Sequence, residues 1–112
     1  MTLILQIVAA IATVITGLFS LIWPQKVFGF TGLTAQGGRG ITEIRAVLGA
    51  FFAGLGVGAL IYGGVAYDML GMAYLCVAAV RTVSMVYDKS VERSNLISVA
   101  TEVVLGVMLI LP

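Results

Sequence analysis

Charged side chains are rare in this chain, and five of them stand where they could meet. Glu43 and Arg45 open an apolar run, Arg81 and Glu102 interrupt two others, and Asp88 follows one of these. Such groups can form ion pairs, bind a phosphate or carboxylate headgroup, or transfer protons. A Glu that is held by Arg stays ionised, which makes it a poor general acid near neutral pH. We therefore predict a ligand-binding or structural charge cluster, with no catalytic residue and no enzyme activity.

The segments that carry these residues are much more apolar than those of a soluble domain. Of 112 residues, 61% are hydrophobic and 10% are charged, whereas roughly a quarter is charged in ordinary soluble domains. A helix needs about 20 residues to cross the ~30 Å hydrocarbon core of a bilayer. The length therefore predicts an all-α protein: one transmembrane domain, 1–112, folded as an antiparallel bundle of four transmembrane helices.

The boundaries of the spans follow from aromatic, glycine and charged residues. We predict spans at about 2–23, 41–62, 68–87 and 94–111. The first ends at Trp23, because Pro24 cannot continue the helix. It has no preceding Lys or Arg and is long for a signal peptide, so we expect it to be retained. The segment 24–33 is either an interfacial amphipathic piece or a plain loop.

The basic residues of the loops predict the orientation. Lys26 and Arg39 lie between the first two spans, and Lys89 and Arg93 lie between the last two. Lys and Arg in short loops stay on the cytoplasmic side. Both of these loops should therefore be cytoplasmic, and both termini should lie on the outer side.

Two of the buried charges are predicted to lie at one depth. Arg81 is six residues before Tyr87 and Glu102 is eight after Ser94, which places them roughly 9 Å and 12 Å from the same edge. An unpaired charge near the middle of a span costs about 2.5 to 3.5 kcal/mol. We therefore predict an ion pair between Arg81 and Glu102.

Glu43 and Arg45 cannot point the same way, because two residues correspond to about 200° around a helix. Glu43 is expected to reach Arg81 across the bundle. Arg45 then faces Asp88, Glu102 or a lipid phosphate. Which Glu pairs with which Arg depends on helix rotations that the sequence does not fix.

Small residues recur every four positions in the second span, and they predict close helix packing. Small side chains let the backbones of membrane helices approach. The predicted packing residues are Ala46, Ala50, Gly54 and Gly58.

The composition also argues against several kinds of partner. The net charge is +1 and the six basic residues are scattered, whereas nucleic-acid binding usually needs a basic stripe. Cys76 is the single cysteine, and there is no histidine. A metal site, a thiol redox pair and a cofactor are therefore not expected.

The pattern ExRAxxG at Glu43, Arg45, Ala46 and Gly49, with an Arg late in the third span and a Glu in the fourth, covers nearly the whole chain. It resembles a bacterial family of four-helix membrane proteins of unknown function, grouped with the DoxD-like superfamily. The resemblance implies a four-helix bundle in the bacterial inner membrane and brings no activity with it.

Three interpretations of the charge cluster remain open. The charges can act as a structural lock that fixes helix order, or Arg45 and Arg81 can bind the phosphate or carboxylate headgroup of a lipid or another amphiphile. The chain can also be an auxiliary subunit of a larger membrane complex or a homo-oligomer. A proton or ion pathway is disfavoured, because the outer half carries few polar groups.

Overall fold

The computed structural model describes residues 2–112, and within them it contains only helices and their connections. Four helices are long and apolar enough to cross a membrane: Thr2–Ile22, Gly37–Tyr62, Val65–Tyr87 and Arg93–Ile110. The prediction of an all-α protein with four spans is therefore confirmed. The second and third helices begin earlier than predicted, at Gly37 rather than 41 and at Val65 rather than 68.

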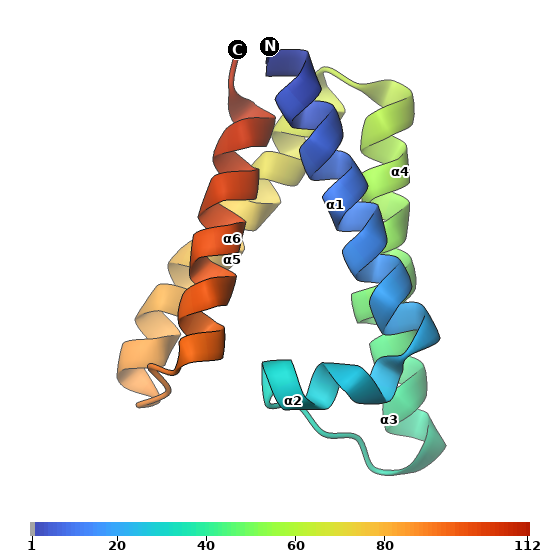
Figure 1. Cartoon of the computed structure of the whole chain (residues 1–112), viewed down its shortest axis with the longest axis vertical. Helices are drawn as coiled ribbons and strands as arrows, with labels where there is room; N and C mark the ends of the chain where they lie inside the picture. Colours follow the sequence, from blue (N-terminus) through green and yellow to red (C-terminus); the bar gives the residue numbers. More distant parts are fainter. Residues whose placement is uncertain (1) are drawn as a thin grey trace.

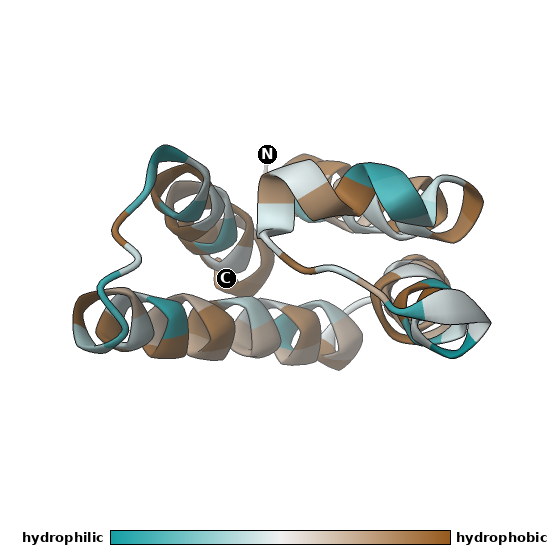
Figure 2. Cartoon of the chain, turned by 90° about the horizontal axis from the view of Figure 1, so that it is seen from below, coloured by the Kyte–Doolittle hydropathy of each residue, from teal (hydrophilic) through white to brown (hydrophobic). Residues whose placement is uncertain are grey.

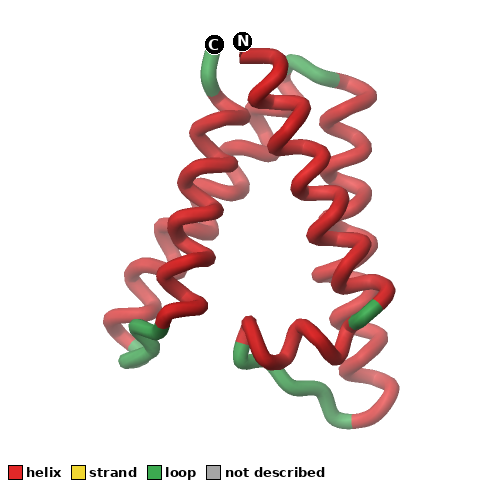
Figure 3. Tube along the Cα trace, viewed as in Figure 1, coloured by secondary structure: helices red, strands yellow, loops and turns green. Residues whose placement is uncertain are grey.

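The helices form two antiparallel pairs that meet at one end and diverge at the other (Figures 1 and 3). One pair joins α1 (Thr2–Ile22) to the second span, and the other joins α5 (Val65–Tyr87) to α6 (Arg93–Ile110). Both termini lie at the end where the pairs meet, which we call the terminal end. The loops that precede α3 and α6 lie at the other end, which we call the loop end.

The second span is one continuous helix with a change of winding. It begins as α3 (Gly37–Glu43), passes through the π-helical segment η2 (Ile44–Phe51), and ends as α4 (Phe52–Tyr62). A π-helix has more residues per turn than an α-helix and occurs often at functional sites. Because η2 is eight residues long, it turns the side chains of Arg45 and its neighbours away from the directions that an α-helix would give them.

Glycines let α1 lie directly against the second span. A Cβ atom added to Gly17 would be 2.6 Å from the carbonyl oxygen of Gly49 and 2.5 Å from the backbone nitrogen of Ala53. One added to Gly56 would be 2.8 Å from the carbonyl oxygen of Ala10. The two backbones are therefore in contact, as small residues allow in membrane helices.

The predicted packing stripe is wrong in its position. Ala46, Ala50 and Gly54 are exposed, and an added Cβ at Gly54 or Gly58 would meet nothing within 4 Å. Ala46 and Ala50 lie in the π-helical segment η2, which has more residues per turn than an α-helix. In the α-helical part of the span, a strict spacing of four drifts around a helix that turns every 3.6 residues. The face that packs instead runs through Gly49, Ala53 and Gly56, with alternating steps of four and three.

The two pairs are joined by a small core at the terminal end. Its buried members come from α1, α4, α5 and α6: Ala9, Ala10, Ala59, Tyr67, Leu70 and Leu109. The amide of Gln6 donates a hydrogen bond of 3.0 Å to the carbonyl oxygen of Leu109. This bond satisfies the Gln6 amide where α1 and α6 come together.

A hydroxyl pair connects α1 to α5 nearer the middle of the molecule. Thr13, which is 1% exposed, donates to the carbonyl oxygen of Ala9 at 2.9 Å. The Tyr74 hydroxyl lies 2.6 Å from the Thr13 oxygen. Since the one hydroxyl proton of Thr13 goes to Ala9, Tyr74 is the donor of this second bond.

Removal of the Tyr74 hydroxyl should weaken the contact between the pairs. We expect Tyr74→Phe to lower the free energy of unfolding by about 1 kcal/mol, because a partly buried hydrogen bond to Thr13 is lost. Unfolding by a denaturing detergent, followed by the fluorescence of the single Trp23, measures it. Tyr62→Phe is the matched control, since Tyr62 is 82% exposed. Equal losses in the two variants would show that the Tyr74 hydroxyl does not join the pairs.

A short helix crosses the opening at the loop end. Segment 24–33 was predicted as an interfacial piece or a plain loop, and the structure gives helix η1 (Pro24–Lys26) followed by α2 (Val27–Thr31). Figure 1 shows α2 running across the direction of the long helices, and it contacts α6. Val27 is buried, and the Lys26 ammonium lies 5.3 Å from the centre of the Trp23 ring. The segment therefore anchors the loop end by apolar and cation–π contacts.

The outer surface of the long helices is apolar. Side chains such as Ile61, Val65, Val80 and Val83 are more than two-thirds exposed. Figure 2, which views the molecule from the loop end, shows hydrophilic residues in the loops and at the starts of helices. Trp23 and Tyr87 are exposed at helix ends, where aromatic residues usually meet the membrane–water interface. The surface therefore fits a lipid environment along the helices and water at their ends.

Candidate functional site

The predicted ion pair between Arg81 and Glu102 is confirmed. Arg81 on α5 donates from Nε to both carboxylate oxygens of Glu102, at 3.0 and 3.1 Å, and from one terminal nitrogen to Oε2 at 2.9 Å. The Glu102 side chain is 12% exposed and that of Arg81 is 34% exposed. Two-point pairing of this kind is the strongest geometry for an Arg and a carboxylate. The pair therefore fixes the rotation of α5 against α6.

Asn95 adds a third contact and fixes the guanidinium group further. The other terminal nitrogen of Arg81 donates to Oδ1 of Asn95 at 3.1 Å. The Asn95 amide in turn donates to the carbonyl oxygen of Ser90 at 2.8 Å. A guanidinium has five N–H bonds, and three of those of Arg81 are used here. The other two have no acceptor among residues 2–112.

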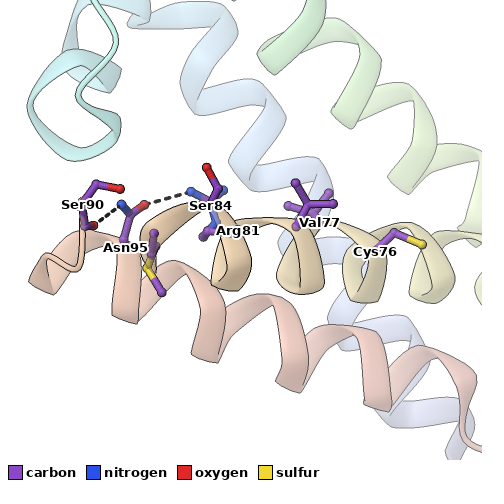
Figure 4. A pocket seen from close by; sticks show the side chains of 8 residues that line it. Cys76, Val77, Arg81, Ser84, Ser90 and Asn95 are labelled. Carbon is purple, nitrogen blue, oxygen red and sulfur yellow. Dashed lines mark hydrogen bonds between the residues drawn. The ribbon is translucent and has the colours of Figure 1, made fainter. Parts of the chain in front are cut away.

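Arg81 forms part of the wall of a pocket of about 500 Å³ at the loop-end half of α5 and α6. Figure 4 shows the labelled side chains of α5 in a row along one side of the helix, followed by Asn95 and Ser90. The polar members lie toward the loop end, and most of the apolar members lie nearer the terminal end. The lining residues are Cys76, Val77, Val80, Arg81, Ser84, Met85, Ser90 and Asn95.

A second hollow continues along the same helix. It measures about 450 Å³ and shares Val80 and Ser84 with the first. Its other lining residues are Ala79, Val83 and Tyr87, so its surface is almost entirely apolar. The pocket that contains Arg81 thus has an apolar neighbour on the outside of α5.

The remaining predicted charges do not join this pocket. Asp88 accepts a hydrogen bond of 2.6 Å from the Ser84 hydroxyl, one turn earlier on the same helix. This local contact leaves Asp88 exposed at the end of α5. Asp88 therefore flanks the site and does not pair with Arg45.

The prediction that Glu43 reaches Arg81 is wrong. Glu43 pairs with Arg39 in the preceding turn, and both side chains are exposed. Arg39 was predicted to lie in the loop between the first two spans, but the helix begins at Gly37 and places Arg39 four residues before Glu43. Residues at this spacing are neighbours on a helix surface. Glu43 therefore pairs with a residue of its own helix and not with Arg81 on the other helix pair.

Arg45 is separate from the Arg81 cluster. It lies in η2 on the other helix pair and is exposed. Among residues 2–112 the ion pairs are Arg39 with Glu43 and Arg81 with Glu102, so Arg45 has no carboxylate partner there. The predicted alternatives with Asp88 and Glu102 are wrong, and contact with a lipid phosphate stays a prediction.

The sequence analysis did not predict that Asn95 accepts a hydrogen bond from Arg81. Asn95 and Glu102 are seven residues apart and share one helix face. That spacing, opposite a single Arg on the neighbouring helix, was the available signal. The pairing of Thr13 with Tyr74 was also missed, and the only signal was their position inside apolar spans.

The four apolar helices and their lipid-compatible surface define a multi-pass membrane protein. Comparison of the chain with protein-family models, with curated proteins and with solved structures finds no match. The resemblance to the DoxD-like superfamily therefore stays a prediction. Among residues 2–112 no group of three His, Cys, Asp or Glu side chains is placed to hold a metal ion.

Proposed function

We propose that this membrane protein binds one amphiphile, with the headgroup at Arg81 and the hydrocarbon chain along α5. One observation carries the proposal: Arg81, which lines an open pocket, is held on three of its N–H groups and has two more without an acceptor among residues 2–112. Binding sites are usually largely preformed, with a few polar groups fixed in place among apolar ones. A guanidinium fixed by Glu102 and Asn95 is such a group.

The order of residues along the pocket supports an amphiphile over a fully polar ligand. Arg81 lies about 9 Å inside the end of α5 by helix rise, and Ser84 lies beyond it toward the loop end. Val77 and Val80 line the other side of Arg81. A headgroup at Arg81 would therefore leave its chain against apolar side chains and, outside α5, against lipid. The ion pair has a second role in the proposal, since it holds α5 to α6.

We place the protein in the inner membrane of a bacterium, with the loop end cytoplasmic and both termini outside. The support is the distribution of charge: all six Lys and Arg residues belong to the loop-end half of the chain's helices and loops. Basic residues in short loops favour the cytoplasmic side. The proposed headgroup site then lies in the cytoplasmic half of the membrane.

The test is native mass spectrometry of the protein extracted in a gentle detergent. The double variant Arg81→Gln with Glu102→Gln removes both charges together and keeps side chains of similar size. We expect the wild type to retain one amphiphile per chain and the double variant to lose most of it, about tenfold or more, which corresponds to 1.4 kcal/mol.

The matched control is Arg39→Gln with Glu43→Gln, which removes an exposed ion pair outside the pocket. It should retain the amphiphile as the wild type does. If the pocket variant carries the same bound mass as the wild type while remaining folded, Arg81 does not hold the headgroup. The same spectra report how many chains associate.

A further inference from the structure

We propose that the headgroup recognised at Arg81 is uncharged and presents hydrogen-bond acceptors, such as an amide, ester or other carbonyl group. This inference rests on the proposed function, because it names the class of amphiphile that the same pocket takes. It begins from the charge of the site. Glu102 contacts Arg81 at three distances of 2.9 to 3.1 Å, so the guanidinium already has its counter-charge.

No other residue that lines the pocket carries a charge. In the loop-end half of this helix pair the charges also cancel, because three basic residues stand against three acidic ones; the remaining acid of α5, Asp68, lies at the terminal end. These are Arg81, Lys89 and Arg93 against Asp88, Glu92 and Glu102. A carboxylate or phosphate bound at Arg81 would therefore be a surplus negative charge beside Glu102, in a region of low dielectric where uncompensated charge is costly.

The positive surplus lies on the other helix pair. At the loop end of that pair, Lys26, Arg39 and Arg45 stand against the single acid Glu43. Arg45 is exposed there and has no ion pair among residues 2–112. Anionic headgroups would therefore be drawn to that pair and its lipid interface, away from the pocket.

The hydrogen-bonding capacity left in the pocket matches a neutral acceptor. Two N–H groups of Arg81 remain without an acceptor among residues 2–112, and they lie on a guanidinium that Glu102 and Asn95 hold in position. The Ser84 hydroxyl donates to Asp88, so its oxygen is left to accept. A primary amide meets both conditions, because its oxygen accepts from Arg81 and its nitrogen donates to Ser84.

Palmitamide and palmitate are a matched pair of probes, with one chain length and headgroups of nearly one shape. They are mixed in equal amounts in detergent at pH 9, where the acid is ionised, and the bound masses are read by native mass spectrometry. We expect the wild type to retain palmitamide over palmitate by roughly tenfold. The ratio of bound palmitamide to bound palmitate in the wild type is divided by the same ratio in the double variant Arg81→Gln with Glu102→Gln. This corrects for any difference in how the two probes partition into micelles.

The single variant Glu102→Gln should reverse the preference, because it leaves Arg81 with an uncompensated charge while keeping one acceptor oxygen. Reversal supports the inference, and an unchanged preference for palmitamide overturns it. If Glu102→Gln does not fold, the comparison of palmitamide with palmitate on the wild type still tests the inference. If the wild type retains palmitate as well as palmitamide, the inference fails and amphiphile binding stands. If it retains neither probe and no native amphiphile, the proposed function fails with it.

Discussion

Gly17→Ala should destabilise the protein by about 2 to 3 kcal/mol, which is the upper range for overpacking a core with one added group. The new Cβ would lie 2.5 Å from the backbone nitrogen of Ala53 and 2.6 Å from the carbonyl oxygen of Gly49. Both of these atoms belong to backbone, so the clash cannot be relieved by a side-chain rotation. Only separation of α1 from the second span relieves it.

The measurement is a titration with a denaturing detergent, followed by the fluorescence of Trp23. Trp23 is the single tryptophan, and it directly follows α1 and packs against Phe19 with the rings tilted and their centres 5.7 Å apart. It therefore reports on the end of the helix that the variant displaces.

Gly54→Ala is the matched control for Gly17→Ala, since it makes the same chemical change on the partner helix. An added Cβ at Gly54 meets nothing within 4 Å. Alanine is a better helix former than glycine by up to about 1 kcal/mol, so Gly54→Ala should be neutral or stabilising. If both variants lost the same free energy of unfolding, the close approach of α1 at Gly49 and Ala53 would be contradicted.

These two glycines also show what the sequence could determine about the fold. Apolar composition and length were enough to predict four spans, because a lipid environment requires long helices that satisfy their own backbone hydrogen bonds. Which face of the second span packs was not determined. It depends on the π-helical winding of Ile44–Phe51 and on the steps of three and four between Gly49, Ala53 and Gly56.

At the candidate site, too, the sequence predicted the depth of residues along the helices correctly but not the direction of every side chain. Depth along a helix follows directly from residue count, and it correctly brought Arg81 and Glu102 to one level. The direction of Glu43 was wrong, because it depended on where the helix began. Extending α3 back to Gly37 placed Arg39 one turn away from Glu43, and a partner on the same helix surface needs no contact between the two helix pairs.

The pocket itself could not be predicted from the sequence. Its lining residues come from α5, α6 and the loop between them, in the half of the molecule where Figure 1 shows the two helix pairs diverging. The Arg81 side chain is 34% exposed there although it lies inside a span. The buried contacts that join the two pairs, including Ala9, Ala10 and Leu109, lie at the terminal end. No periodic pattern in the chain encodes the angle between the pairs.

Glu102→Leu should be the most destabilising single change at the site, by about 3 kcal/mol, near the lower end of the range for breaking a buried ion pair. The loss arises because Arg81 would keep its charge without a counter-charge, and the lower end applies because 34% of its side chain is exposed. The double variant Arg81→Met with Glu102→Leu should come within about 1 kcal/mol of the wild type, since replacement of both charges by apolar groups is often neutral or stabilising.

The double-mutant cycle measures this coupling, with unfolding again followed by Trp23 fluorescence. The coupling energy should exceed about 1 kcal/mol for Arg81 with Glu102, because contacting residues in one network are not additive. The same cycle on Arg39 and Glu43 is the control and should give about 0.5 kcal/mol or less, as exposed pairs at this spacing do. A double variant at the site as unstable as Glu102→Leu alone would show that Glu102 supports the bundle through packing and not through the charge of Arg81.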